Sequence, residues 1–393
     1  MDEAVDTTDQ LITILSTCAL SDRVIADVPQ MLSEAAQDQD PGNMYLRVFY
    51  ILLAFGQNEL ALQMQKKALK HRCVYRIANP SVARIRLLAI MGPGDLRDNT
   101  PLDFLIERSD IRLELLFVST EIDIPAAIPD HDVAFIALNE STKNWPILDK
   151  VAAMLEKWPR PYINDPQNIV NCARHTASRL LQNIPGLYVP ETRRIHRGEV
   201  GECVFPAIIR PVDTHGGKNL KRVNSWEELG RFFEEEGADA EAFYISEFVD
   251  YRSDDGCYRK MRIVLIDRKP YICHFAISPD WIVHYAKADM ESSAEKKAEE
   301  ALFMENFDVD FAVRHQGALS AIADRLELDY VVIDCSELRN GELLFFEADV
   351  AGWVHAKDAI DTFPYKPRIM QKAFDAFRAM LLNKSGIASA DFS

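Results

Sequence analysis

Residues 329–350, DYVVIDCSELRNGELLFFEADV, contain two apolar runs separated by a short polar segment. The first run covers 329–334, the second covers 343–350, and Asn340-Gly341 lies between them. An Asn-Gly pair between two such runs is a strong signal for a tight turn, so the runs are predicted to pair as an antiparallel hairpin. This hairpin decides the fold, because it indicates an antiparallel sheet near the end of the chain.

Three carboxylates converge on this hairpin, at Asp334, Glu347 and Asp349. Glu347 and Asp349 are two residues apart and so project from one face of their strand, while Asp334 lies at a comparable distance from the turn. Partly buried, unpaired acids repel one another, and a divalent cation relieves the repulsion. Oxygen ligands without histidine favour Mg²⁺, so the hairpin predicts a magnesium site. The alternative, three acids on the exposed face of an edge hairpin, remains open.

Long strands dominate the sequence upstream of this hairpin, after a predicted helix at 168–183. Arg268 alone separates two of the apolar runs, which predicts another tight hairpin. The sequence therefore indicates an antiparallel sheet with helices between its strands. These further strands are predicted at 207–211, 243–249, 259–267 and 269–278.

A predicted phosphate site follows the first of these strands. The strand ends at Arg210, and the segment after it contains Gly216, Gly217 and Lys218. Paired glycines let backbone amides bend around phosphate oxygens, and the two basic side chains supply the matching charge. A Gly-Gly pair by itself is a weak signal, so a plain turn without a ligand remains the alternative.

Two further positions favour a nucleotide. Glu247, Phe248 and Val249 end a strand with one acid beside an apolar shelf, as a purine-binding hinge that uses backbone groups would. Arg262 lies within an apolar strand, where an unpaired guanidinium is costly. A ligand phosphate or a carboxylate is therefore expected to neutralise Arg262.

The order of these features resembles that of the ATP-grasp superfamily of carboxylate ligases, over about residues 160–382. The sequence is most similar to the branch that contains ribosomal-protein glutamate ligase and D-alanine ligase, whose members bind Mg-ATP between two α+β lobes. The resemblance implies an α/β and α+β multidomain protein with an ATP-grasp fold. It also implies an ADP-forming ligase that activates a carboxylate as an acyl-phosphate and joins it to an amine, with ATP and Mg²⁺ as cofactors.

The resemblance also implies roles for individual residues. Arg262 would stabilise the γ-phosphoryl group during transfer, and Asp334 and Glu347 would be magnesium ligands. The implied nucleotide-binding positions are Arg174 and Arg210 in place of two lysines, Gly216, Gly217 and Lys218 in the loop over the phosphates, and Glu247, Phe248 and Val249 at the adenine.

The sequence departs from the family pattern at several positions. Asp349 stands where the family usually has Asn, and Lys260, another predicted nucleotide contact, stands where it usually has Asp. In the region expected to meet the acceptor, His284 is a candidate for substrate positioning and catalysis. These departures leave a second hypothesis open, namely a catalytically silent nucleotide-binding scaffold that recruits a partner protein.

The chain divides into four predicted segments. They are a helical domain at 1–82, a small α/β domain at 83–160, the ATP-grasp domain at 161–384 and a flexible tail at 385–393. The small α/β domain rests on short apolar runs at 84–90, 113–118 and 133–138.

The helical domain contains two amphipathic stretches, 44–55 and 59–72, which are predicted to form an antiparallel helix pair. Small residues at Gly56, Ala61 and Ala68 make the pair similar to one tetratricopeptide repeat. Two interpretations remain open: a cap packed on the next domain, or a surface that binds a protein or peptide partner. In the second case the ligase would act on a peptide.

Composition excludes several classes of function. Asp and Glu total 61 against 44 Lys and Arg, and the net charge of -17 disfavours general nucleic-acid binding. No apolar run approaches the roughly 20 residues that span a bilayer, and the acidic N-terminus is unlike a secretory signal, so a cytoplasmic protein is expected. Seven cysteines without a CxxC pair indicate reduced thiols. The oligomeric state stays open, a homo-oligomer included.

Overall fold

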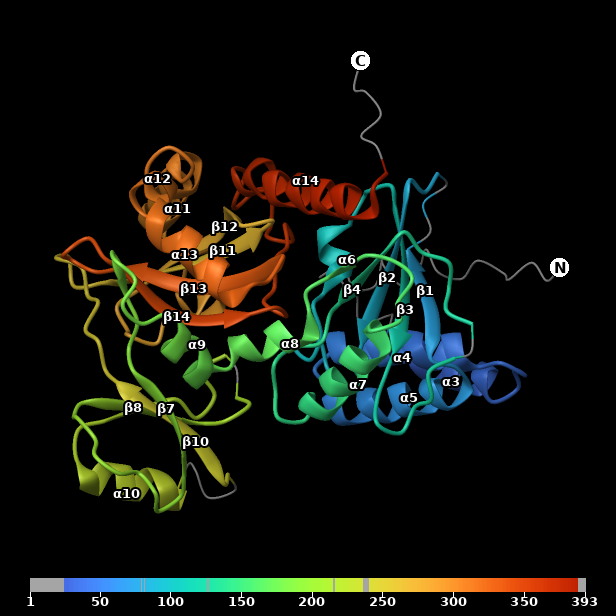
Figure 1. Ribbon diagram of the computed structural model, residues 1–393, viewed down its shortest axis with the longest axis horizontal. Helices are drawn as coiled ribbons and strands as arrows, with labels where there is room; N and C mark the ends of the chain where they lie inside the picture. The colour runs from blue at the N-terminus through green and yellow to red at the C-terminus, as the bar shows by residue number, and fades with distance from the viewer. Residues whose placement is uncertain are drawn as a thin grey trace. The chain divides into compact units, whose positions relative to one another are not determined.

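The computed structural model describes residues 25–387 except 79, 81, 126, 215 and 236–239. Part of the predicted helical domain, residues 1–24, and most of the predicted tail, residues 388–393, lie outside the described residues. The chain forms two compact units, drawn in Figure 1. The first comprises residues 1–169, 350–359 and 371–393, and the second comprises residues 170–349 and 360–370. This division places the predicted helical and small α/β segments together in the first unit.

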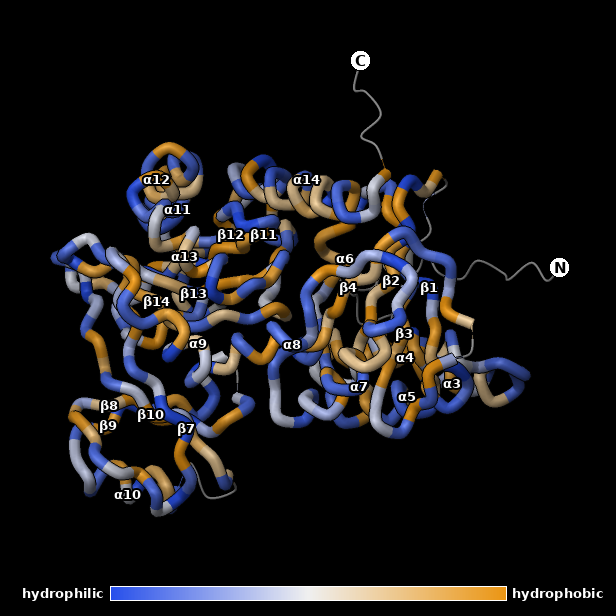
Figure 2. Tube along the Cα trace, in the orientation of Figure 1, coloured by the Kyte–Doolittle hydropathy of each residue, from blue (hydrophilic) through white to orange (hydrophobic). Residues whose placement is uncertain are grey.

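A mostly parallel five-stranded sheet forms the centre of the first unit, in the order β1-β3-β2-β4-β5. Only β1 runs antiparallel to its neighbour β3. The three predicted apolar runs form β2, β3 and β4, whose hydrophobic residues are seen in Figure 2, whereas β1 and β5 were not expected. The strands are β1 (Val74–Ala78), β2 (Ile85–Met91), β3 (Ile111–Phe117), β4 (Val133–Ile136) and β5 (Tyr162–Ile163).

The predicted helix pair is present as α4 (Gly42–Ala54) and α5 (Asn58–His71), with α3 (Val28–Ala35) packed on α4. In Figure 1 the pair lies along one side of the sheet, and α4 is buried around much of its circumference. A helix apolar all round belongs in a core, so α4 packs as part of the first unit. Packing of the helix pair in this unit agrees with the cap interpretation, and partner binding by the pair stays a prediction.

The small residues of the helix pair have different roles. Ala61 and Ala68 are fully buried, as close helix packing requires. Gly56 instead has φ +70°, and a Cβ there would meet nothing within 4 Å. Its function is therefore to turn the chain between the helices, because glycine adopts positive φ at little cost.

The remaining helices of the first unit are α6 (Leu102–Leu105), α7 (Trp145–Leu155) and α8 (Pro166–Ile169). The C-terminal helix α14 (Lys366–Ser385) begins in the second unit and ends in the first. Within the first unit its Arg378 donates to Asp110 at 2.8 and 2.6 Å. The C-terminal segments are thus attached to the N-terminal sheet, a long-range connection that local sequence patterns do not reveal.

The second unit contains two sheets. The smaller is antiparallel, in the order β7-β10-β8-β9, and α10 (Trp226–Glu235) covers one of its faces. Leu229 and Phe232 of α10 pack with Ile209 and Phe243 in its core. Its strands are β7 (Thr192–His196), β8 (Ala207–Pro211), β9 (Lys221–Val223) and β10 (Ala242–Glu247).

The larger sheet has the order β12-β11-β13-β14-β6, antiparallel except for the last pair. Phe303 of α11 stacks on Phe275 of β12 with ring centroids 4.3 Å apart, so α11 packs on this sheet. The elements are β6 (Leu187–Tyr188), β11 (Tyr258–Ile266), β12 (Lys269–Ser278), β13 (Tyr330–Glu337), β14 (Leu343–Asp349), α9 (Arg174–Leu180), α11 (Ala294–Asn306), α12 (Phe311–Arg314) and α13 (Gln316–Leu326).

Both predicted hairpins of the larger sheet are confirmed. Asp267 and Arg268 join β11 to β12 with φ of 51° and 68°, the backbone that a tight two-residue hairpin needs. Gly341, at φ 84°, turns the chain between β13 and β14. The predicted helix at 168–183 is wrong as a single element, because the segment is divided into α8, a 3-10 helix at Val170–Cys172 and α9.

Within the described residues, no helix is both long enough and apolar enough to cross a membrane.

Candidate functional site

A cavity of about 230 Å³ lies in the second unit, lined by residues from both of its sheets. Twelve of the predicted site residues line it. Arg174 belongs to α9. The others are Arg210, Gly216, Gly217, Glu247, Phe248 and Val249 from the smaller sheet and its loops, and Lys260, Arg262, His284, Asp334 and Glu347 from the larger sheet and the loop after β12. The structure thus brings together side chains that are up to 173 positions apart in the sequence.

A row of three charged side chains on the larger sheet lines this cavity. Arg262 on β11 is directly opposite Asp334 on β13, and Asp334 is directly opposite Glu347 on β14. Directly opposed residues of an antiparallel ladder project from the same face of the sheet. Strand pairing therefore places cation, acid and acid side by side, which explains why the three face one cavity.

Asp334 is the centre of the row. Its side chain is 3% exposed, and it accepts hydrogen bonds from Arg262 at 2.8 and 3.0 Å and from Lys260 at 2.8 Å. Burial alone would raise the pKa of Asp334, but the charges of Arg262 and Lys260 outweigh it and hold that pKa well below its usual value. The carboxylate is therefore ionised at neutral pH.

Glu347 has a different cationic partner. Arg174, the first residue of α9, forms an ion pair with it. Burial would raise the pKa of Glu347, but Arg174 outweighs this effect and lowers the pKa below its usual value. Lys260 and Arg262 thus neutralise Asp334, and Arg174 neutralises Glu347, so each of the two acids has at least one cation.

The three predicted magnesium ligands do not gather into one group. Asp349 is not among the residues that line the cavity, whereas Asp334 and Glu347 both are. Within the described part of the chain, no three His, Cys, Asp or Glu side chains are arranged to hold a metal ion. Lys260 and Arg262 pair with Asp334, and Arg174 pairs with Glu347, so these cations take up carboxylate oxygens that a metal would use.

Arg210 differs from the other cations of the cavity. It is 9% exposed, and its guanidinium donates to the hydroxyl and the backbone oxygen of Thr214. Among the residues that the structure describes, no carboxylate forms an ion pair with it. Burial, and then repulsion from Arg174, lower the pKa of Arg210 to about 9. The charge of Glu347 partly offsets these effects, but no carboxylate of the described residues contacts the guanidinium directly, so an anionic ligand would lower the cost of burying it.

The Gly216-Gly217 turn forms one border of the cavity. Both residues have positive φ, 63° and 73°. A Cβ at Gly217 would lie 3.3 Å from Ile282, and one at Gly216 would lie 3.7 Å from Nε2 of His284. Glycine is therefore needed here for backbone conformation and, at Gly217, for close approach to the 282–284 segment.

His284 reaches the Gly216 side of the cavity with its Nε2. Its Nδ1 is enclosed and has no hydrogen-bond partner among the described residues. Burial, followed by the charges of Lys260, Lys287 and Arg262, lowers the pKa of His284. The imidazole is therefore neutral at pH 7 and able to accept a proton.

An aromatic wall stands beside the end of β10. Phe248 contacts Trp281 edge to face at 5.5 Å, and the Arg222 guanidinium lies 4.1 Å from the Phe248 ring centroid. Tyr188 donates to Glu247 at 2.7 Å, and this bond, aided by burial, raises the pKa of Tyr188 to about 12. A flat heteroaromatic ring is suited to such an apolar shelf with polar groups at its rim.

Part of this wall could not be predicted from the sequence, and one predicted contact, Lys218, lies outside the cavity lining. Tyr188 and Arg222 lie on the short strands β6 and β9, which carry no hydrophobic pattern long enough to predict. Trp281 could have been predicted, because it precedes His284 in the same loop. Lys218 is exposed and does not line the cavity, so its assignment to phosphate remains a prediction.

No protein-family model matches the chain, and no curated protein matches it by sequence. Among solved structures, the chain is similar to D-alanine–D-alanine ligase from Bacillus anthracis complexed with ATP, at 15% identity and TM-score 0.46, over 77% of this chain and 96% of that one. It is also similar to a RimK domain ATP-grasp protein from Sphaerobacter thermophilus, at 15% identity and TM-score 0.44, over 76% and 99% of the two chains. VanG D-Ala:D-Ser ligase from Enterococcus faecalis is a third, at 12% identity and TM-score 0.48, over 76% and 99%. Likeness at this level carries no argument about the reaction of this chain.

Proposed function

We propose that the cavity of the second unit binds Mg-ATP and that the protein is an ADP-forming ligase that joins a carboxylate to an amine. The observation that carries this proposal is Arg210, a nearly buried guanidinium without a carboxylate partner in the described residues, beside Arg174 and behind a Gly-Gly turn. A cation held in this way is expected to meet the phosphates of a ligand. The aromatic shelf of Phe248 and Trp281 would accept the base.

The donor set is compatible with magnesium. Mg²⁺ in nucleotide sites usually takes one or two protein carboxylates together with phosphate oxygens and water. Asp334 and Glu347 provide two facing carboxylates, and the 30% exposed side chain of Glu347 is the more accessible. The ion would neutralise phosphate oxygens and polarise the transferred phosphoryl group.

The proposed reaction has two steps. A substrate carboxylate oxygen attacks the γ-phosphorus of ATP, the bond to the β,γ-bridging oxygen breaks, and ADP leaves with the electron pair. An amine nitrogen then attacks the carbonyl carbon of the acyl-phosphate, phosphate leaves with the electron pair of the carbon–oxygen bond, and the amine loses one proton. Arg262 would bind the transferring group, with Lys260 and Arg210 on the other phosphates.

His284 is suited to receive that proton. Its imidazole is neutral at pH 7, and its Nε2 lies at the Gly216 side of the cavity. A general base must be unprotonated when the nucleophile approaches. His284→Gln is therefore expected to slow amide formation more than acyl-phosphate formation.

The first step has a test that needs no knowledge of the acceptor. Mg-ATP labelled with oxygen-18 in the β,γ-bridge is incubated with pools of carboxylates, and scrambling of the label into non-bridging positions reports reversible phosphoryl transfer. We expect scrambling with one pool, at least 100-fold slower in Arg262→Gln and unchanged in Arg231→Gln, an exposed arginine on α10. If the scrambling rate saturates with added peptide and not with free amino acids, the substrate is a peptide.

A catalytically silent nucleotide-binding scaffold is the second candidate, and one observation favours it. Lys260, which stands where the family usually has Asp, forms a 2.8 Å ion pair with Asp334 and competes with a metal for its oxygens. A silent protein would bind Mg-ADP but give no scrambling with any carboxylate pool. If Lys260→Asp then restored scrambling, Lys260 would be the cause of the silence.

A further inference from the structure

A cluster of buried polar side chains connects α11, α14 and the segment after β12 in the second unit. Glu300 of α11 is 0% exposed and Lys366, the first residue of α14, is 1% exposed. Nζ of Lys366 lies 3.4 Å from Oε1 of Glu300, and this oxygen also accepts from the backbone amide of Phe275 at 3.1 Å. Apolar side chains of similar size often stabilise a core as well as a buried ion pair does, so stability alone does not explain this pair.

Tyr285 joins the pair to the candidate site. It is the first residue of a short 3-10 helix, Tyr285–Lys287, which directly follows His284. Its hydroxyl donates to Oε2 of Glu300 at 2.8 Å and accepts from Lys366. Nζ of Lys366 also lies 4.1 Å from the centroid of the Tyr285 ring. Both members of the buried pair therefore hold Tyr285 in place.

The segment 281–284, which lines the cavity, is held at both of its ends. At one end, the Tyr251 hydroxyl donates to the backbone oxygen of Trp281 at 2.6 Å. At the other end, the backbone oxygen of His284 accepts from the amide of Lys287 at 2.9 Å. Because Tyr285 is the next residue along the chain, a movement of Tyr285 would also move His284.

The Tyr285 ring also approaches the row of charged side chains. Its centroid lies 4.7 Å from that of His274 on β12, and His274 is directly opposite Arg262 on β11. Tyr285 is thus adjacent to two residues to which the proposed function assigns a role. It precedes neither of them by chance contact with solvent, because its hydroxyl is bonded to the buried pair.

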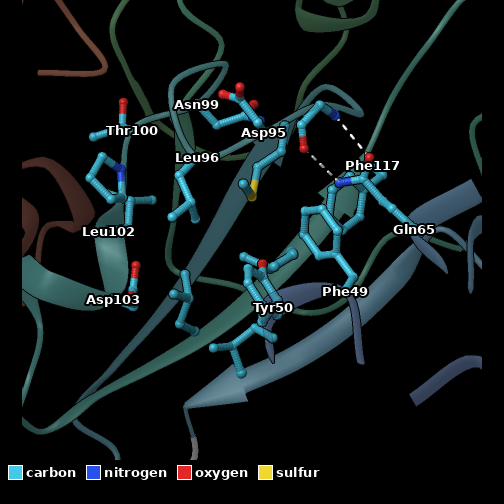
Figure 3. Close-up of a pocket in the computed structure, with 16 residues that line it drawn as sticks. Phe49, Tyr50, Gln65, Asp95, Leu96, Asn99, Thr100, Leu102, Asp103 and Phe117 are labelled. Carbon is cyan, nitrogen blue, oxygen red and sulfur yellow. Dashed lines mark hydrogen bonds between the residues drawn. The ribbon is translucent and has the colours of Figure 1, made fainter. Parts of the chain in front are cut away.

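The cavity of the first unit gives a comparison, because its polar contacts lie in a different part of the fold (Figure 3). Gln65 of α5 donates to the backbone oxygen of Gly94 at 3.1 Å and accepts from its amide at 2.9 Å, as the dashed lines in Figure 3 show. These two bonds attach α5 to the turn after β2. Gln65 therefore provides a control for a loss of stability that arises in the other unit.

We propose that the Glu300–Lys366 pair is a positioning element that, through Tyr285, fixes the segment 281–284 and orients His284 for the proton transfer of the proposed reaction. The inference rests on the proposed function for the role of His284, and on contacts within the second unit for the positioning. A buried, hydrogen-bonded polar network rigidifies the groups that it connects. Placement of a general base matters because a misplacement of about 1 Å can cost on the order of a hundredfold in rate.

Tyr285→Phe and Tyr365→Phe are a matched pair of variants. Tyr365 donates to the same Oε2 of Glu300 at 2.7 Å, but it lies outside the segment next to the cavity. Each variant loses one hydrogen bond to Glu300, so we expect similar falls in the thermal midpoint. The measurement that separates them is the pKa of His284, obtained by NMR titration of the full chain without nucleotide. His284→Gln assigns the resonance.

The pKa of His284 reports its position. Burial, followed by the charges of Lys260, Lys287 and Arg262, lowers this pKa, and the charge of Asp334 opposes them. We expect a higher pKa in Tyr285→Phe than in wild type, because a loosened segment exposes the imidazole to water and moves it away from these cations. Tyr365→Phe and Gln65→Met should keep the wild-type pKa.

Glu300→Gln combined with Lys366→Met tests the pair itself. The double variant removes both charges together, so it leaves neither of them buried and unpaired. It should raise the pKa of His284 as Tyr285→Phe does. If the double variant fails to fold, Tyr285→Phe alone decides the question.

An unchanged pKa of His284 in Tyr285→Phe, or an equal rise in Tyr365→Phe, would overturn the proposal. Because the titration needs no nucleotide, its result is separate from that of the proposed function. If the pKa rises in Tyr285→Phe but Mg-ADP does not bind to wild type, the positioning stands and the proposed function fails. With an identified substrate, Tyr285→Phe should slow amide formation at least about tenfold and leave oxygen-18 scrambling within about threefold of wild type. Equal slowing of both steps would also overturn the proposal.

Discussion

The buried charge of Arg210 is expected to favour binding of an anionic ligand and to lower the stability of the ligand-free protein. Its guanidinium is nearly buried, and both burial and the neighbouring Arg174 lower its pKa to about 9. A site that keeps a charge ready for a ligand commonly does so at the expense of the free protein.

Replacing this charge by an apolar side chain of similar length should therefore stabilise the free protein. We expect Arg210→Met to raise the free energy of unfolding by about 1–2 kcal/mol, measured as a higher thermal midpoint without nucleotide. Arg231→Met, at an exposed position on α10, should change it by less than about 0.5 kcal/mol. A lower midpoint for Arg210→Met would show that the charge of Glu347 and the hydrogen bonds to Thr214 outweigh the cost of burying the guanidinium.

Asp334 is expected to have the opposite effect on stability. Asp334→Asn leaves Arg262 and Lys260 without their common acid, so we expect a loss of about 3–5 kcal/mol at pH 7. The folded-state pKa is depressed, so this stabilisation is present above the unfolded-state pKa of about 3.9 and is lost as the pH falls below it.

Denaturation midpoints of wild type and Asp334→Asn at pH 7 and at successively lower pH measure this effect. The two proteins should converge below pH 4, as the wild-type carboxylate gains its proton. A difference that stays constant down to pH 2 would contradict the account of the charged row.

At the scale of elements, the Gly216-Gly217 turn is predicted to act on ligand binding more than on folding. Gly217→Ala places a Cβ 3.3 Å from Ile282 at a φ of 73°, which costs about 1–2 kcal/mol and shifts the turn. We expect the KM for ATP to rise about tenfold. Gly341→Ala is the matched control, because it imposes a similar φ of 84° on the β13–β14 turn, where a Cβ meets nothing within 4 Å. Equal effects of both variants on KM would remove the turn from the binding site.

The larger sheet shows what the sequence can predict about elements. Its long apolar runs became β11 to β14, and the separators Arg268 and Asn340-Gly341 became the two turns, because hydrophobic runs and turn residues act locally. The two-residue strand β6 was not predictable, since its pairing with β14 depends on a distant partner. The predicted helix at 168–183 is interrupted at Val170–Cys172, where the Asn171 side chain donates to the backbone oxygen of Leu326, a contact with a distant part of the chain.

At the scale of the whole molecule, the sequence predicted twelve residues that line one cavity but not the partners with which they pair. Arg262 was expected to need a phosphate or a carboxylate, and the structure supplies Asp334 from the adjacent strand. The pairing of Arg174 with Glu347 joins positions 173 residues apart and follows only from the fold. The two-unit division also escaped prediction, because residues 350–359 return to the first unit through contacts such as that of Val350 with Thr100.

Nucleotide binding through Arg210, in the cavity between the two sheets of the second unit, is the step on which the proposed function depends. It is tested by isothermal titration calorimetry of Mg-ADP into wild type, Arg210→Met and Arg231→Met. We predict saturable binding to wild type and Arg231→Met, and binding at least tenfold weaker to Arg210→Met, although that variant is the more stable in the free state. Undetectable binding to wild type, or equal affinity for wild type and Arg210→Met, would contradict the claim.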